Sequence, residues 1–337
     1  MRLSEVYGFI RFLSRIGMRI KKIQNSKFKI QNLGLMLCAL SLFSCEDYYK
    51  NDYKDNSPTS GKLKVYYSEG LQSHIENQAA TFSSQYHNVN IELFSVYENE
   101  LINALLIDSC KAIVISRLLG ENEKKVFEQK KLFPMYSALA KSGVALITSS
   151  TTKLNTITVE QVKQLLNAEL SMKDSLGNLI SPVAVLDNNC SSVAYYLLDS
   201  IISAKKFGAK CFAANNTSEL LEKIAANPNQ IGFLDFAWLS DRDDELFIKY
   251  SSKIKFLSVG KTDTAYFAPN QSSFKTGEYP FTRTIYLLRR SDDFSLAKGF
   301  EAFMAGPKGQ LTFLKQGLLP VRQAERIIEV KMEPIGQ

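Results

Sequence analysis

Residues 62–96 read KLKVYYSEGLQSHIENQAATFSSQYHNVNIELFSV, and this stretch decides the fold class. It predicts a strand over 63–67, a helix over 71–86 and a second strand over 89–96. The two outer runs are rich in β-branched and aromatic residues, and apolar residues recur at helical spacing between them, at Leu71, Ile75, Ala79 and Phe82. The order of strand, helix and strand favours an α/β fold with mainly parallel sheets.

The same alternation continues along the rest of the chain. Further strands are expected at 112–116, 144–148, 183–186, 231–234, 254–259 and 279–288, and further helices at 99–107, 121–129, 158–166, 193–202, 217–226, 296–304 and 310–315. Ligands of such sheets lie beyond the carboxyl ends of the strands, where loops and helix N-termini meet. Because 337 residues exceed one comfortable domain, we expect two lobes.

The charge distribution argues against several classes of function. The net charge of +7 lies entirely in residues 1–44, and the remainder of the chain is neutral. Phosphate-backbone binding needs clustered Lys and Arg, so we expect no nucleic-acid partner. The chain has two histidines, His74 and His87, which leave little room for a His-rich metal site or a His-based catalytic apparatus. We therefore predict neither an enzyme nor a cofactor.

The first residues indicate export. Basic residues up to Lys29 precede an apolar run over 33–44, which fits a signal-peptide core and is short for a membrane-spanning helix. The run ends in Leu42-Phe43-Ser44-Cys45, which resembles the lipobox of bacterial lipoproteins. We predict cleavage after residue 44 and a lipid on Cys45; the alternative is an ordinary secretory signal in which Cys45 is incidental. Either Met1 or Met18 is the start.

The residues after Cys45 predict a flexible tether over 45–61, because they contain almost no aliphatic side chains to bury. Export would place the protein on the periplasmic side of a membrane or at the cell surface, where disulfides form. Three cysteines remain in the body, so at least one of them stays free or pairs between chains. Cys190 with Cys211 is the candidate pair.

Several stretches, in this order, resemble the PstS-like phosphate-binding lipoproteins of ABC importers. The stretches are Ala112 to Arg117 with Glu121 to Glu123, Gly143 to Ile147, Leu154 to Thr158 with Gln161 and Leu165, Asn189 to Ser192, Ile231 to Phe233, Tyr279 to Arg283, and Gly309-Gln310 with Gly317. The resemblance implies a bilobed periplasmic-binding-protein fold of type II, with two α/β lobes joined by two hinge strands. It places lobe 1 at 62–142 plus 282–337 and lobe 2 at 143–281, and implies a monomer.

Three loops are candidates for holding an oxyanion, because metal-free anion sites need converging backbone and hydroxyl donors and often one Arg. The first loop offers Ser68, Glu69 and Gly70, the second Ser116 and Arg117, and the third Ser191 and Ser192. Each loop has a plain structural alternative, either helix capping or a surface ion pair. Arg283 is a further candidate from the hinge. Glu69 is the expected acceptor for the proton of hydrogen phosphate. Trp238, the sole tryptophan, is expected in the core.

The chain departs from the family at three places. Many relatives have Asp-Glu where this chain has Ser68-Glu69, and Asp-Gly at the hinge where it has Ser142-Gly143. Some relatives carry an Arg in the third loop, whereas residues 187–196 contain no basic residue and include Asp187. An ionised Asp187 would repel an anion unless it is neutralised or turned away.

The resemblance therefore predicts a lipid-anchored solute-binding protein that captures phosphate or a similar oxyanion by hinge closure and delivers it to an ABC permease. The departures keep an alternative open, a diverged member that serves as a surface adhesin, sensor or assembly component.

Overall fold

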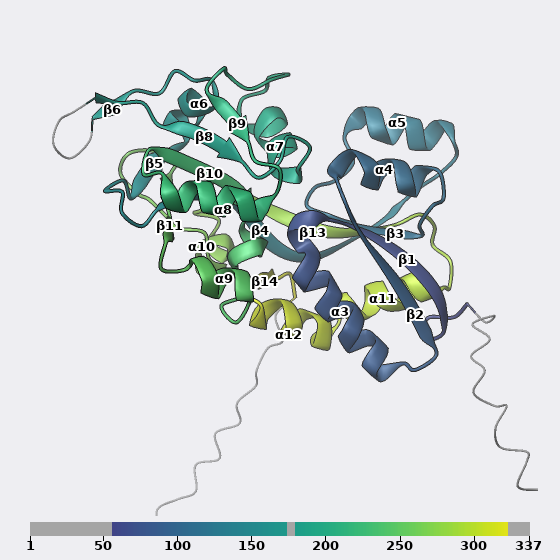
Figure 1. The fold of residues 1–337 in the computed structure, drawn as a ribbon. Coiled ribbons are helices and arrows are strands. Elements are labelled where there is room, and N and C mark those ends of the chain that lie inside the picture. Colours follow the sequence, from purple (N-terminus) through teal and green to yellow (C-terminus); the bar gives the residue numbers. More distant parts are fainter. Residues whose placement is uncertain (1–55, 174–178, 323–337) are drawn as a thin grey trace, which may run out of the picture. The chain divides into compact units, whose positions relative to one another are not determined.

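A computed structural model describes residues 56–173 and 179–322 (Figure 1). The strands are β1 Gly61–Ser68, β2 Val89–Val96, β3 Ala112–Ile115, β4 Met135–Ser149, β5 Thr156–Thr158, β6 Met172–Lys173, β7 Leu179–Ile180, β8 Val183–Leu186, β9 Cys211–Ala213, β10 Gln230–Asp235, β11 Ile254–Phe256, β12 Ser258–Gly260, β13 Thr282–Arg289 and β14 Leu319–Pro320.

The helices alternate with these strands. The α-helices are α3 Gln72–Gln85, α4 Glu98–Leu106, α5 Glu121–Gln129, α6 Val159–Leu166, α7 Ser192–Tyr196, α8 Thr217–Ala226, α9 Glu245–Tyr250, α10 Gln271–Thr276, α11 Leu296–Ala305 and α12 Pro307–Lys315. Two 3-10 helices, η1 Glu69–Leu71 and η3 Phe236–Leu239, follow strands β1 and β10, and a π-helix, η2 Leu197–Ile201, extends α7.

The quoted stretch forms the expected parallel unit. β1 pairs with β2 in parallel from Gly61 opposite Val89 to Ser68 opposite Val96, and α3 connects them. β3 joins the other edge of β1, also in parallel. The same arrangement recurs later in the chain, where β8 pairs in parallel with β9 and with β10. The helix over 158–166 begins as predicted, because the Thr158 hydroxyl accepts from the Gln161 amide and the Gln161 side chain accepts from Thr158 N.

The expectation of mainly parallel sheets is wrong at the centre of the structure. β4 is fifteen residues long and lies antiparallel to all of its partners. Its first part pairs with β13, as far as Gly143 opposite Thr282, and its second part pairs with β10 from Val144 opposite Asp235. One continuous strand thus serves two groups of strands, which links them into one path, β2-β1-β3-β13-β4-β10-β8-β9.

Gly143 is needed where β4 passes from β13 to β10. A Cβ at this position would lie 2.8 Å from the Phe281 carbonyl oxygen and 3.1 Å from the ring of Phe274. The backbones of β4 and of the segment before β13 therefore approach each other more closely than any other residue type permits. The sequence places its hinge strands at this point, and the exact lobe boundaries stay a prediction.

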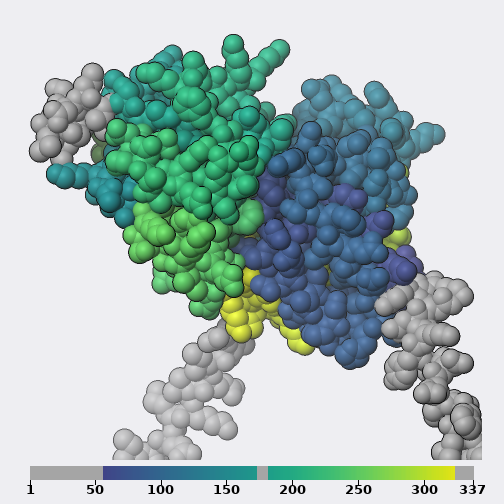
Figure 2. All heavy atoms as spheres, viewed as in Figure 1, coloured from purple at the N-terminus to yellow at the C-terminus, as the bar shows by residue number. Residues whose placement is uncertain are grey.

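Strand β3 is buried on both faces and divides the apolar side chains into two clusters. Ala112 and Val114 face the larger cluster, which contains α3 and α11, whereas Ile113 and Ile115 face a smaller one with α4 and α5. Because β3 is buried on both faces, its sequence is continuously apolar and does not alternate between apolar and polar residues. Figure 2 shows the residues up to α5 in blue and those of the middle of the chain in green, with the two surfaces abutting along a seam.

Several sequence-based expectations need correction. Residues 56–61, predicted as the end of the tether, contact α11: the Asn56 side chain accepts a hydrogen bond from Leu296 N at 3.1 Å, and β1 begins at Gly61. Cys190 and Cys211 are both free, so the candidate disulfide is absent from the described residues. The expected strand over 254–259 is two separate strands, β11 and β12, which pair with different partners.

Other expectations lie outside the described residues. They are the signal peptide over 1–44, the lipid-bearing Cys45, the choice between Met1 and Met18, the tether up to residue 55 and the last part of lobe 1 over 323–337. Within the described ranges, no helix combines the length and the apolar character that crossing a membrane requires.

Candidate functional site

A cavity of about 170 Å³, here called the small cavity, gathers four of the predicted ligand-binding residues, namely Ser116, Arg117, Ser192 and Arg283. Ser116 and Arg117 follow β3, Ser192 begins α7 and Arg283 lies in β13. Residues distant in the chain therefore meet at the carboxyl ends of β3 and β8, where the fold class places ligands. Its other lining residues are Glu98, Leu118, Gly120, Tyr195, Tyr196, Asp199 and Ser200.

Arg283 brings a buried positive charge to the third loop. Its Nη1 donates to the Ser192 carbonyl at 3.0 Å and approaches the Ser192 hydroxyl at 3.3 Å, and its Nη2 donates to the Asp235 carboxylate. Only 5% of the surface of residue Arg283 is exposed. The third loop has no basic residue of its own, and the hinge strand supplies one from 91 residues away in sequence.

Arg117 is held by two carboxylates. Its Nε donates to Glu98 Oε1 at 2.5 Å, and its two terminal nitrogens donate to Glu123 at 2.7 and 2.9 Å. The guanidinium also stacks 4.5 Å from the centre of the Tyr195 ring. A ligand-binding role for Arg117 stays a prediction, and its charge is already balanced by the two acids.

Several buried polar atoms of the predicted loops and of their neighbours have no hydrogen-bond partner among the described residues. They are the hydroxyls of Ser68 and Ser116, one carboxylate oxygen each of Glu69 and Glu98, and the Nε of Arg283. Buried polar groups are normally paired, because an unpaired one costs about 1–3 kcal/mol. Ser116, Glu98 and Arg283 all line the small cavity, so a polar ligand there would supply missing partners.

The hydroxyl of Ser191 is occupied within the protein. It donates to Asp187 Oδ1 at 2.6 Å and accepts from Ala194 N at 3.1 Å, where it caps α7. Asp187 Oδ1 also accepts from Asn188 N at 2.9 Å. Burial raises the pKa of Asp187 to about 7 although these two hydrogen bonds lower it. The negative charge that the sequence places in the third loop is therefore partly neutralised near neutral pH.

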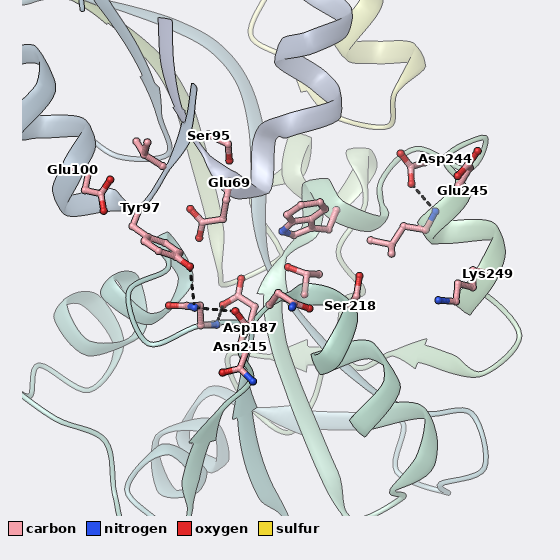
Figure 3. Close-up of a pocket in the computed structure, with 16 residues that line it drawn as sticks. Glu69, Ser95, Tyr97, Glu100, Asp187, Asn215, Ser218, Asp244, Glu245 and Lys249 are labelled. Carbon is pink, nitrogen blue, oxygen red and sulfur yellow. Dashed lines mark hydrogen bonds between the residues drawn. The ribbon is translucent and has the colours of Figure 1, made fainter. Parts of the chain in front are cut away.

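The first loop lies apart from the small cavity. Gly70 meets Asp235, since a Cβ on Gly70 would lie 2.7 Å from the Asp235 Cβ, so its close approach serves packing between η1 and η3. Ser68, which ends β1, is fully buried. Glu69 lines a second and larger cavity together with Asp187 (Figure 3). The predicted ligand roles of all three residues stay untested.

The second cavity, here called the large cavity, has a volume of about 760 Å³. It is lined by Glu69, Ser95, Val96, Tyr97, Glu100, Asp187, Asn188, Asn215, Asn216, Thr217, Ser218, Trp238, Asp244, Glu245, Leu246 and Lys249. Trp238 packs against the core with part of its side chain only, so the expectation of a core tryptophan is half right. Burial raises the pKa of Glu69 to about 8, and the charges of Asp187, Glu98 and Asp235 add to the shift.

The residue that the sequence-based prediction missed is Asp235. It ends β10, accepts from the Ser142 hydroxyl at 3.0 Å and pairs with Arg283. Asp235 therefore supplies a carboxylate beside Ser142, the position at which the sequence resemblance leads us to expect Asp. The available signal was the position of Asp235 at the carboxyl end of a predicted strand, which is the same signal that identified Ser116 and Arg117.

Comparison with known proteins agrees with this architecture. The chain is 21% identical over 299 residues to the phosphate-binding protein PstS of Pseudomonas aeruginosa, and the match covers 82% of this chain and 89% of that protein. It is 22% identical over 231 residues to PstS of Borreliella burgdorferi, covering 66% of this chain and 76% of the relative.

Solved structures show the same fold. The crystal structure of a putative phosphate ABC transporter substrate-binding protein with bound phosphate from Clostridium perfringens superimposes with a TM-score of 0.65 at 18% identity, over 78% of this chain and all of the other. A phosphate transport receptor from Vibrio cholerae gives a TM-score of 0.60 at 16% identity, over 77% and 100%. The prediction of a bilobed periplasmic-binding-protein fold is confirmed.

A protein-family model described as a PBP superfamily domain matches residues 54–308. This match includes β1 through α11, and with them both groups of strands, the strand β4 that links them and the loops that line the small cavity. The chain belongs to the PBP superfamily.

Proposed function

We propose that this protein is an extracytoplasmic solute-binding lipoprotein that captures a small oxyanion, phosphate in the first instance, and delivers it to an ABC permease. The observation that carries the proposal is the small cavity, where Ser116 after β3, Ser192 at the start of α7 and Arg283 in β13 converge. The Ser116 hydroxyl and the Arg283 Nε there have no hydrogen-bond partner among the described residues. Its volume of about 170 Å³ suits a ligand of a few heavy atoms. The PstS relatives and the phosphate-bound neighbour make phosphate the first anion to test.

In this mechanism the ligand joins the two groups of strands. Ser116 and Arg117 follow β3, and Ser192 follows β8, on the other side of β4 in the sheet. An anion that accepts hydrogen bonds from both sides would stabilise the closed form, which a permease could then recognise. Arg283 lies on a hinge strand and contacts Ser192, so a change in its contacts on anion binding would act directly on the hinge.

A second candidate is a diverged member without a transport role. The observation in its favour is that both arginines of the small cavity already have carboxylate partners, Glu98 and Glu123 for Arg117 and Asp235 for Arg283. An incoming anion must therefore share each guanidinium with an acid. This arrangement lowers the electrostatic gain of anion binding and fits a site that no longer takes one.

Thermal unfolding of the purified protein separates the two candidates. The protein is stripped of bound solute by unfolding and refolding, then heated with phosphate, arsenate, sulfate, molybdate or citrate at constant ionic strength. A bound solute raises the stability by RT ln(1 + [L]/Kd), so phosphate should raise the melting temperature in proportion to the logarithm of its concentration.

Ser116→Ala is the informative variant. The Ser116 hydroxyl is buried and has no partner in the described part of the chain, so its removal should leave the fold intact. It should weaken the phosphate response by about tenfold through the loss of one hydrogen bond to a charged ligand. Ser84→Ala, on the exposed surface of α3, is the matched control and should respond like the wild type. Stability that does not change with any of the five anions would favour the diverged member.

A further inference from the structure

The large cavity has the wrong charge for an anion. Five acidic side chains line it, namely Glu69, Glu100, Asp187, Asp244 and Glu245, against the single cation Lys249. Lys249 is exposed, and its ammonium lies 3.9 Å from Glu222 and 4.9 Å from the centre of the Tyr250 ring, so other groups already engage it. Burial raises the pKa of Glu69 to about 8 and that of Asp187 to about 7, so both hold protons part of the time near neutral pH. The three other acids still outnumber the single cation, so the cavity attracts positive charge.

Two of these acids, Glu69 and Asp187, lie on opposite sides of the cavity and are largely buried. Glu69 follows β1 and Asp187 follows β8, at the carboxyl ends of two parallel strands. Figure 3 shows Glu69 above and Asp187 below, with Tyr97 on one side and Lys249 on the other. One oxygen of Glu69 is buried without a hydrogen-bond partner among the described residues, and Asp187 is 97% buried, as 3% of its surface is exposed.

The proximity of these carboxyls has an electrostatic cost. The charge of Asp187 is the main contribution, after burial, to the raised pKa of Glu69. Two carboxylates that face each other need either a proton or a cation between them. A positively charged group in the large cavity would pair with both acids and would leave neither of them uncompensated.

The walls of the cavity select the kind of cation. Tyr97 and Trp238 both line it. Aromatic faces bind ammonium groups through cation–π attraction, most strongly at tryptophan. A bare metal ion fits poorly, because no three His, Cys, Asp or Glu side chains in the described part of the chain are placed to hold one. At about 760 Å³, the cavity has room for an organic molecule.

We propose that the large cavity binds an organic cation, an amine or quaternary ammonium compound, whose charged nitrogen lies between Glu69 and Asp187. Trp238 and Tyr97 contribute apolar contact and cation–π attraction, and the side-chain oxygen of Asn215, which also lines the cavity, accepts a hydrogen bond from an amine. This site is separate from the small cavity, and the proposal does not depend on oxyanion binding.

The single tryptophan provides the readout. Trp238 fluorescence of the full chain is titrated with choline, putrescine and spermidine, with sodium chloride replaced to hold the ionic strength constant. At least one of these amines should give a saturable change in Trp238 emission and a matching rise in melting temperature. Magnesium chloride at the same charge concentration should give neither.

Two variants and one control locate the site. Glu69→Gln and Asp187→Asn should each weaken the amine affinity by at least about tenfold, because each removes one partner of a buried charge pair. Glu128→Gln removes an equal charge from the exposed surface of α5 and should bind like the wild type. The phosphate response and its dependence on Ser116 are measured on the same variants, so each proposal fails or holds by itself.

Three results would overturn the proposal. They are the absence of a saturable response to all three amines, an amine affinity that is equal in Glu69→Gln, Asp187→Asn and the wild type, and an equal response to magnesium. The use of two separate variants protects the experiment against misfolding of one, since Glu69→Gln keeps the shape of the side chain and touches none of the hydrogen bonds that Asp187 accepts.

Discussion

Replacing Glu69 with Gln should change how the stability of the protein depends on pH. Burial and the neighbouring acids raise the pKa of Glu69 from 4.5 to about 8. A carboxyl with a raised pKa holds its proton more tightly in the folded state, so its contribution to stability is complete below pH 4.5 and is lost as the pH rises toward 8. Gln cannot ionise, and this loss is therefore removed in the variant.

The magnitude follows from the two pKa values. Between pH 5 and pH 7 the unfolded chain releases the Glu69 proton while the folded protein largely retains it, which costs the wild type about 2.5 kcal/mol by the linkage relation. The free energy of unfolding of Glu69→Gln should therefore rise relative to the wild type by about 2.5 kcal/mol over this range. Because the charges of Asp187 and Glu69 interact, the difference reports the loss of the Glu69 proton together with its effect on Asp187, whereas the other titrating groups contribute equally to both proteins.

Urea unfolding at pH 5, 6 and 7, followed by circular dichroism, measures this difference directly. Glu128→Gln is the control, because Glu128 is exposed on α5 and its replacement should give the same small difference from the wild type at every pH. If the difference between Glu69→Gln and the wild type is also constant across the three pH values, then Glu69 is ordinarily ionised and the electrostatic reasoning about the large cavity is refuted.

Two further predictions concern the hinge and the anchor. Gly143→Ala should lower the free energy of unfolding in urea by about 1–3 kcal/mol, because the new methyl would lie 2.8 Å from the Phe281 carbonyl oxygen. Ala145→Gly in the same strand should lack this steric effect. An unfolding free energy of Gly143→Ala equal to that of the wild type would contradict the close approach. Cys45→Ala should move the protein from the membrane fraction of expressing cells to the soluble or secreted fraction, and retention in the membrane would rule out a lipid on Cys45.

Sequence reasoning worked where the signal is local. The run from Glu121 to Gln129 forms a helix with the predicted bounds, and Val89 to Val96 forms a strand with the predicted bounds, because their residues repeat with the period of the element they form. The first half of β4, from Met135 to Gly143, was missed. Its residues include Lys141 and Ser142 and show no clear period, and the segment is a strand because β13 pairs with it, from Thr282 opposite Gly143 to Arg289 opposite Met135.

The site shows the same division. The rule that ligands lie at the carboxyl ends of strands found Ser116, Ser192 and Arg117, which do line one cavity. The rule could not show that Glu69 lines a different cavity. The distance between the first and second loops depends on the paths that the chain takes through η1 after β1 and toward α5 after β3, and these paths are not local in sequence. The partner of Arg283 was also beyond local reasoning, since Asp235 lies 48 residues earlier and meets it only after both groups of strands have formed.

The buried pair of Arg283 and Asp235 changes the meaning of the missing arginine in the third loop. A sequence with no basic residue over 187–196 suggests a lost anion site, yet the structure places the guanidinium of Arg283 against Ser192. However, Arg283 is already paired with the carboxylate of Asp235. A buried charge is costly unless it is paired, so Asp235 stabilises Arg283 and would compete with any anion that enters the small cavity. Under the proposed function, the affinity for phosphate should depend on how far the Ser116 hydroxyl and the Arg283 Nε, which lack partners among the described residues, compensate for this competition. This dependence makes Ser116, and not either arginine, the residue at which anion binding is best tested.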